Sequence, residues 1–484
     1  MGILGILLGL SLLIVLAFRG WSILLLAPAS ALAAALIVGE PLLANWTQTF
    51  MGSAAHFLAQ FFPLFLLGAL FGKLMDDSGS VSVIADFMTQ KLGTKHAILA
   101  VVLAGALVTY GGVSLFVAFF VLAPMAQSLF KIAAIPRRLM PATIVLGTST
   151  FTMSALPGTP SIQNAIPMPF FGTTLFAAPG LGIIASIVVL FFGMWWLKRA
   201  ETAAKREQEQ FGENTPAVVE HIVNDQFIRG RATTAHEFDT AEITHGCHSM
   251  ELPPITLAIL PVFIVISVNF LMTLVILPRI DFSFLAQKEW GATSLSAVGG
   301  VWSIIIALAS AIVIVILFNH KRLTNLRETM DAGANASVLP VLTVASLVGF
   351  GAVIASFPIF AVVRDWVLEL GGGPLVSLAT ATNILTAITG SASGGLSIAL
   401  DSLGNTYLLL AQKYGIDPAL LHRIAVMSSG TLDTLPHNGA IVTLLAVCQS
   451  THRESYRDII IVGIIGPIIA LSIVIFLGSQ FGSF

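Results

Sequence analysis

Long apolar runs dominate the pattern of this chain, and polar residues interrupt them at only a few places. A run of roughly 20 apolar residues is long enough to cross a bilayer as a helix. The pattern therefore predicts five spans in each half of the chain, at 2–18, 21–38, 55–75, 139–178, 181–197, 253–277, 297–318, 336–358, 419–447 and 458–482. Glycine, proline and hydroxyl residues break the spans 139–178 and 419–447, which we interpret as interrupted helices.

Two further apolar stretches, 97–130 and 372–412, are each interrupted near the middle by a short polar motif. The motif "TYGGVS" breaks the first stretch, and "TGSASGG" breaks the second. We predict that each stretch is a re-entrant hairpin, which enters and leaves on one side of the membrane. Non-helical backbone at that depth is tolerated only inside protein or beside a water-filled cavity, so both tips are expected to lie in the protein interior.

The composition agrees with a membrane protein, because 56% of the residues are hydrophobic and only 10% are charged. Soluble domains carry about 25% charged residues. The net charge of −2 gives no indication of a nucleic-acid partner, and two cysteines cannot form a disulfide framework. The apolar N-terminal run has no basic residue before it, so we interpret it as a retained span and not as a signal peptide.

The basic residues predict an orientation with both termini outside and the long polar linker 198–252 in the cytoplasm. In this arrangement most of the 23 lysines and arginines face inward, as the positive-inside rule expects. The predicted outward-facing ones are Arg279, Lys288, Arg364, Lys413 and Arg423.

The linker divides the chain into a first unit, 1–197, and a second unit, 253–484. It contains the motif "HGCH" at 245–248, but adjacent ligands do not match the usual spacing of a zinc site. A solvated linker is the better interpretation, and no metal or cofactor is expected.

The two units align when the sequence is shifted by 279 residues. The shift places Gly111 on Gly390 and Ser114 on Ser393, and it places "STFTMSALPGT" (149–159) on "SSGTLDTLPHN" (428–438). A unit with an odd number of spans must have its copy inverted in the membrane, which is the architecture of many secondary transporters. The prediction is thus an all-α membrane protein of two inverted repeats, with about ten transmembrane helices, two hairpins and two interrupted helices. Alternatively, these residues only kink ordinary membrane helices.

The polar breaks are the candidate binding site. A helix broken within the membrane offers N-termini with unpaired N–H groups and a partial positive charge, which suit an organic anion. Hydroxyl and amide side chains beside the breaks would add hydrogen bonds, although serines that bond only to their own backbone are common. The candidate substrate-binding residues are Gly112, Ser114, Thr152, Ser154, Thr159, Ser391, Ser393, Thr431 and Asn438.

Asp433 and His437 are the candidate proton-coupling pair. A carboxylate at the centre of a membrane helix costs about 2.5–3.5 kcal/mol even on insertion scales, so such a residue is functional by default. Histidine titrates near neutral pH. The alternative is that Asp433 caps a half-helix and that His437 is satisfied in the interior.

Four segments resemble the gluconate permease family of bacterial proton symporters: "FFPLFLLGALFGKLMDDSGS", "LVTYGGVSLFVAFFVLAPMA", "IPRRLMPATIVLGTSTFTMSALPGTPSIQN" and "SSGTLDTLPHNGAIVTLLAVC". The resemblance implies proton-driven uptake of a small hydroxy-monocarboxylate across the bacterial inner membrane. It also implies a homodimer and an elevator-type motion. The form "TLDTLPHNGA" lacks the acid that gluconate transporters tend to carry after the asparagine, and it is more similar to the branch assigned to 3-hydroxybutyrate.

Other function classes fit less well. A sodium-coupled carboxylate transporter stays open, and so does an anion channel, because re-entrant hairpins also build selectivity filters. The sequence has no nucleophile elbow, no "HExxH" motif and no phosphate-binding glycine loop with a lysine, so we expect no enzyme and no ATP-driven pump.

Overall fold

A computed structural model describes residues 2–18, 21–207, 209, 211, 251–362, 365, 372–436 and 438–484. Every regular element in these ranges is a helix. His437 and the motif 245–248 lie outside the described residues, so the structure does not bear on those two sequence interpretations.

Helices of the first half are short where the sequence is broken and long where it is uniformly apolar. They are α1 (Gly2–Phe18), α2 (Ile23–Val38), α3 (Leu42–Ala44), α4 (Met51–Asp77), α5 (Ser80–Leu92), α6 (Ala97–Tyr110), α7 (Leu115–Ile132), α8 (Leu139–Thr148), α9 (Phe151–Ser154), α10 (Ile162–Ala165), α11 (Pro167–Phe171) and α12 (Pro179–Arg206).

The second half follows the same order of long helices, hairpin and interrupted helix. Its helices are α15 (Ile255–Leu271), α16 (Leu295–Asn319), α17 (Leu326–Ala336), α18 (Val338–Ser356), α20 (Gly373–Thr389), α21 (Ala392–Tyr414), α22 (Pro418–Thr431), α23 (Gly439–Val447), α24 (His452–Ile460) and α25 (Gly466–Phe481).

The chain is an all-α, multi-pass membrane protein with interrupted helices. Among the described residues, 6 helices are long and apolar enough to cross a bilayer, or up to 7 if a bent pair counts as one span. The bent pair is 80–92 with 94–110, and it turns by 104°. Sequence analysis did not predict α5, because its mixed polar and apolar residues resemble a loop between spans.

Helix ends in the two halves coincide under the 279-residue shift found in the sequence. The end of α4 at Asp77 corresponds to the end of α18 at Ser356, and the end of α6 at Tyr110 corresponds to the end of α20 at Thr389. The start of α8 at Leu139 corresponds to the start of α22 at Pro418. The sequence similarity at the breaks therefore extends to these three helix termini beside them.

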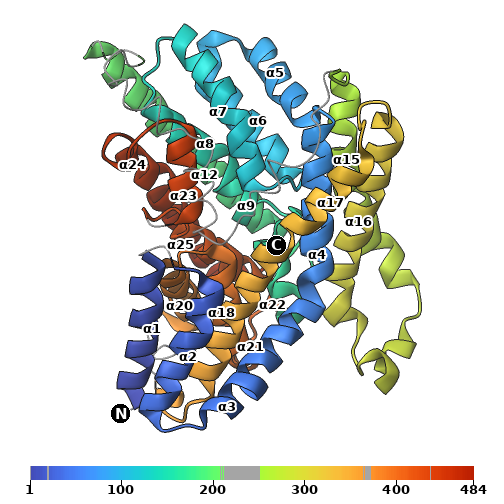
Figure 1. Cartoon of the computed structure of the whole chain (residues 1–484), viewed down its shortest axis with the longest axis vertical. Coiled ribbons are helices and arrows are strands. Elements are labelled where there is room, and N and C mark those ends of the chain that lie inside the picture. Colours follow the sequence, from blue (N-terminus) through green and yellow to red (C-terminus); the bar gives the residue numbers. More distant parts are fainter. Residues whose placement is uncertain are drawn as a thin grey trace.

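The two long helices α4 and α18 pack against each other and cross the molecule diagonally in Figure 1. The pair α1–α2 packs on α18, whereas the pair α15–α16 packs on α4. Figure 1 shows these two pairs on opposite sides of the molecule, with the hairpins and interrupted helices between them. The arrangement brings the polar breaks of both halves into the interior.

Two basic residues used to predict the orientation are in fact buried. Arg423, predicted to face outward, lies on α22 with 0% of its surface exposed, and Lys73 on α4 is likewise fully buried. Arg423 therefore does not face solvent, and it gives no information on the orientation. A count of charges along the sequence assumes that each arginine meets water, and it cannot detect one whose hydrogen bonds are all made by distant backbone.

Candidate functional site

Both hairpins turn at a glycine and resume as a helix at a serine. Gly112 adopts a φ of 94° after α6, and Ser114 is the N-cap of α7. In the second hairpin Gly390 has a φ of 65°, and the Oγ of Ser391 accepts a hydrogen bond from the N–H of Gly394 at 3.1 Å. Positive φ is accessible to glycine without steric cost, which explains why "GG" and "TG" mark these tips.

The first interrupted helix ends at Ser154 and resumes as a helix only after the turn at Pro157 and Gly158. Hydroxyl groups of this segment bond mainly to nearby backbone. The Oγ1 of Thr152 donates to the carbonyl of Gly147 at 2.9 Å, and the Oγ of Ser154 donates to Thr150 at 3.1 Å. Both hydroxyls therefore bond to backbone carbonyls beside the break, and the carbonyl of Thr150 also accepts the N–H groups of Met153 and Ser154.

The second interrupted helix is tied to the second hairpin by Asp433 and Asn438. The Oδ1 of Asp433 accepts hydrogen bonds from the N–H of Ala392 and from the Nδ2 of Asn438, each at 2.9 Å. Nδ2 of Asn438 also donates to the carbonyl of Gly390 at 2.8 Å, and its Oδ1 caps α23 through the N–H of Ala440 at 2.8 Å.

Asp433 thus caps the hairpin helix α21 rather than the half-helix that follows it, which Asn438 caps. Thr431 donates to the carbonyl of Ser428 at 2.8 Å and also to the side-chain oxygen of Asn383. The carboxylate is positioned across two elements that are about 40 residues apart in sequence, a contact that the local sequence could not indicate.

The two breaks contact each other directly. Gly430, near the end of α22, lies so close to Ser154 that an added Cβ would be 2.5 Å from its Oγ. Only a glycine allows this approach, since real Cβ atoms essentially never come within 3.0 Å of a heavy atom. The two breaks, which are repeat partners of each other, thereby share one interior surface.

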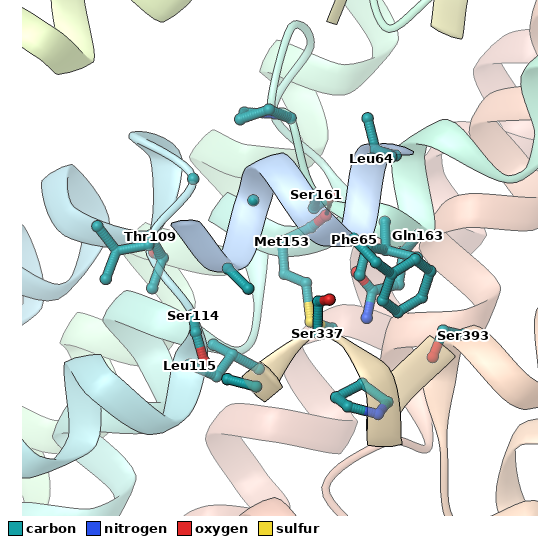
Figure 2. Close-up of a pocket in the computed structure, with 18 of the residues that line it drawn as sticks. Leu64, Phe65, Thr109, Ser114, Leu115, Met153, Ser161, Gln163, Ser337 and Ser393 are labelled. Atoms are coloured by element: carbon teal, nitrogen blue, oxygen red, sulfur yellow. Dashed lines mark hydrogen bonds between the residues drawn. The ribbon is translucent and has the colours of Figure 1, made fainter. Parts of the chain in front are cut away.

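A cavity of about 200 Å³ lies between the first hairpin tip, the first break and the two long helices. It is lined by Leu64, Phe65, Gly68, Ala69, Thr109, Gly112, Val113, Ser114, Leu115, Thr148, Met153, Pro160, Ser161, Ile162, Gln163, Ala336, Ser337, Pro340, Val344 and Ser393. None of these described residues is charged. Figure 2 shows Ser114, Ser337 and Ser393 around the cavity, with Phe65 and Met153 contributing an apolar wall.

Both halves contribute equivalent positions to this cavity. Ser114 and Ser393 are related by the 279-residue shift, and both line it. Phe65 on α4 and Val344 on α18 are related in the same way, and they line it too. The cavity therefore lies where the two repeats meet.

The structure separates the predicted binding residues into two groups. Gly112, Ser114 and Ser393 line the cavity. A second group makes hydrogen bonds that hold the breaks and hairpin tips: Thr152, Ser154, Ser391, Thr431 and Asn438. Thr159 belongs to neither group, because its buried Oγ1 has no partner among the described residues.

Several polar lining residues were not predicted from the sequence: Thr109, Thr148, Ser161, Gln163 and Ser337. Ser337 lies at the junction of α17 and α18, inside a stretch that we assigned to loop and span. Ser161 and Gln163 follow Pro157 within the predicted break, so proximity to the proline was the available signal.

Comparisons with known proteins agree with a transport function. A scan against models of known protein families finds no match. A Bacillus subtilis (strain 168) protein, described as the uncharacterized transporter YxjC, is 41% identical over 471 residues, which is 95% of each chain. The chain belongs to the transporter family of this Bacillus protein. It is a membrane transporter and not an enzyme.

Two solved transporter structures share the fold at low sequence identity. The YdaH transporter of Alcanivorax borkumensis, noted for an unusual topology, has a TM-score of 0.55 and 16% identity, covering 91% of this chain and 89% of its own. Neisseria gonorrhoeae MtrF, described with a class of antimetabolite efflux pumps, has a TM-score of 0.54 and 14% identity, covering 91% and 85%. At these identities the likeness concerns the architecture alone.

Proposed function

We propose that this transporter is a secondary active symporter that moves a small hydroxy-monocarboxylate together with a proton. The observation that carries the proposal is the cavity at the junction of the repeats. There Ser114 and Ser393 lie at the starts of two hairpin helices, and none of the described lining side chains is charged. Hydroxyl groups and helix N-termini can bind a carboxylate without a salt bridge. A substrate that is bound without a salt bridge can also be released.

The size and the lining of the cavity favour a small substrate with one apolar end. A space of about 200 Å³ with Phe65 and Met153 on one wall suits the methyl end of 3-hydroxybutyrate. Ser114, Ser337 and Ser393 would then face its oxygen atoms. Gluconate, which carries a hydroxyl on every carbon beyond the carboxylate, would leave that apolar wall without a complementary group.

Proton coupling would act through Asp433. Its Oδ1 holds the N–H of Ala392, and the next residue, Ser393, lines the cavity. An ionised Asp433 repels an anion in the cavity, whereas protonation removes the repulsion and weakens the contact with the hairpin tip. Proton and anion would therefore each favour the binding of the other, because coupling between two sites is reciprocal.

The wider assignment follows the resemblance to the gluconate permease family. It comprises a bacterial inner-membrane location with both termini outside, the linker 198–252 in the cytoplasm, a homodimer, and an elevator-type motion of the hairpins. His437 would complete the proton pathway with Asp433. Sodium coupling is the alternative for the ion.

Uptake into proteoliposomes tests the proposal. Labelled 3-hydroxybutyrate and labelled gluconate are supplied with and without an inward proton gradient, in sodium-free buffer. We expect saturable uptake of 3-hydroxybutyrate that the gradient stimulates. Uptake that requires added sodium would refute proton coupling, and uptake that does not saturate would indicate a channel.

A further inference from the structure

Arg423 is a fully buried arginine whose hydrogen-bond acceptors are all neutral. It lies in the second turn of α22, and 0% of its surface is exposed. Its Nε and Nη2 donate to the carbonyl of Ala177 at 3.0 and 2.6 Å, Nη1 donates to Ala155 at 3.2 Å, and Nη2 reaches Leu175 at 3.4 Å. Carbonyl dipoles stabilise the guanidinium, but they do not cancel its charge.

Within the described part of the chain, no carboxylate forms an ion pair with Arg423, in contrast to the other buried base. Lys73 has the carboxylate of Asp77 at 2.9 Å, and both side chains are fully buried. Burying an isolated charge costs several kcal/mol unless it is paired. Among the described residues, the guanidinium thus keeps a positive charge in the interior that carbonyl dipoles hold and no carboxylate neutralises.

A short segment of the chain connects this charge to a wall of the cavity. Ala155, which accepts from Nη1, comes two residues after Met153 of the cavity lining. Ser161, which also lines the cavity, donates to the carbonyl of Met153 at 2.7 Å. The segment 153–161 therefore contacts the guanidinium through Ala155 and lines the cavity through Met153 and Ser161.

The surroundings of Arg423 exclude water. An added Cβ at Gly182 on α12 would lie 2.6 Å from the carbonyl oxygen of Ala155 and 3.3 Å from Nε of Arg423, so α12 closes tightly over the group. Charges interact more strongly in such a low-dielectric interior than in water. A positive charge fixed here raises the electrostatic potential inside the uncharged cavity.

We propose that Arg423 sets the charge selectivity of the transporter by favouring anions in the cavity without touching them. The inference rests on the proposed function, since it concerns the same cavity and its anionic substrate. Arg423 is in this sense a specificity-determining residue that acts through space, and the hydroxyls of the cavity supply the direct contacts.

The test compares an anion with a neutral ligand of the same shape. Binding of 3-hydroxybutyrate and of its primary amide, 3-hydroxybutanamide, is measured on the purified protein, and the ratio of the two dissociation constants is the readout. The wild type is expected to prefer the acid. Arg423→Gln removes the charge and is expected to lower this preference about ten-fold, equivalent to about 1.4 kcal/mol, whereas Arg423→Lys keeps the charge and stays within about three-fold of the wild type.

Tyr110→Phe is the matched control. The Tyr110 hydroxyl donates to the carbonyl of Pro157 at 2.8 Å in the same segment, so its removal disturbs the wall without changing its charge. The acid-to-amide ratio should then stay at the wild-type value. If Tyr110→Phe lowers the preference for the acid as much as Arg423→Gln does, then the shape of the wall, and not the charge, sets this preference.

A wild-type ratio in folded Arg423→Gln would overturn the inference. If Arg423→Gln does not purify as folded protein, the wild type alone still tests the inference. Equal binding of acid and amide by the wild type would contradict it. The proposed function is tested by a different result, the absence of gradient-driven uptake. That result does not affect the ratio of the two dissociation constants or its dependence on Arg423.

Discussion

Asp433 holds the tip of the second hairpin, and its charge is the feature that the repeat does not require, because its partner in the first half is Ser154. Asp433→Asn keeps an acceptor oxygen for the N–H of Ala392 and for Asn438, but it cannot take up a proton. We expect a folded protein whose uptake no longer responds to a proton gradient. Uptake in proteoliposomes with and without the gradient measures this.

Ser428→Ala is the control for Asp433→Asn, because the Ser428 hydroxyl only donates to the carbonyl of Ile424 at 2.6 Å within its own helix. Its response to the gradient should match the wild type. A normal gradient response in Asp433→Asn would leave this carboxylate with the capping role alone.

Ser391 and Ser393 are two residues apart, but they serve different purposes. Ser393 lines the cavity, so Ser393→Ala is expected to raise KM about ten-fold, through loss of a hydrogen bond to a charged ligand worth about 1.5–3 kcal/mol. Ser391 caps α21, so Ser391→Ala should lower stability by about 1 kcal/mol with little change in KM. Initial rates of uptake and thermal unfolding of both variants separate the two effects. Equal KM values would remove Ser393 from the binding site.

At the scale of elements, the contact between the two interrupted helices depends on Gly430. Gly430→Ala places a methyl group 2.5 Å from the Oγ and 2.8 Å from the Cβ of Ser154, so the two breaks must separate. We expect a lower unfolding temperature and slower uptake, with a cost of about 1–3 kcal/mol as in other overpacked interiors. Thermal unfolding and initial uptake rates measure both.

Gly52→Ala on α4 is the control for Gly430→Ala, because an added Cβ there meets nothing within 4 Å. The double variant Gly430→Ala/Ser154→Gly should recover most of the loss, since it removes the side chain that the methyl group meets. Failure of this rescue would mean that the cost arises elsewhere than at the contact of the two breaks.

At the scale of the whole molecule, a buried ion pair within α4 accepts a hydrogen bond from α17. Lys73 lies 2.9 Å from Asp77, both are fully buried, and Thr329 of α17 donates to Asp77 at 2.7 Å. Asp77→Asn leaves the lysine unpaired and is expected to cost about 3–5 kcal/mol. The double variant Lys73→Met/Asp77→Asn removes both charges, keeps an acceptor for Thr329, and should be clearly more stable than the single variant.

Thermal unfolding of the wild type, both single variants and the double variant completes this cycle. Equal destabilisation by Asp77→Asn and by the double variant would contradict the explanation, because the loss would then not arise from an unpaired charge.

The class of the molecule and the positions of its breaks could be predicted from the sequence alone. These features follow from local chemistry, because apolar runs must cross lipid and clusters of glycine, proline and hydroxyl residues interrupt helices. Single prolines do not suffice, since Pro63 and Pro124 lie inside α4 and α7. Gly111 with Gly390 and Ser114 with Ser393 could be matched without coordinates, because a repeat is a property of the sequence. Three helix termini then coincided under the same shift.

Tertiary contacts, in contrast, determine which polar residues face the cavity. Thr152 and Ser114 are equally polar in sequence, but one bonds to the backbone of Gly147 and the other lines the cavity. Arg423 counted as an outward-facing charge until the carbonyls of Ala155 and Ala177, about 250 residues away, proved to surround it. Such contacts join distant segments, and the hydrophobic pattern records burial along one helix but not the identity of the neighbour.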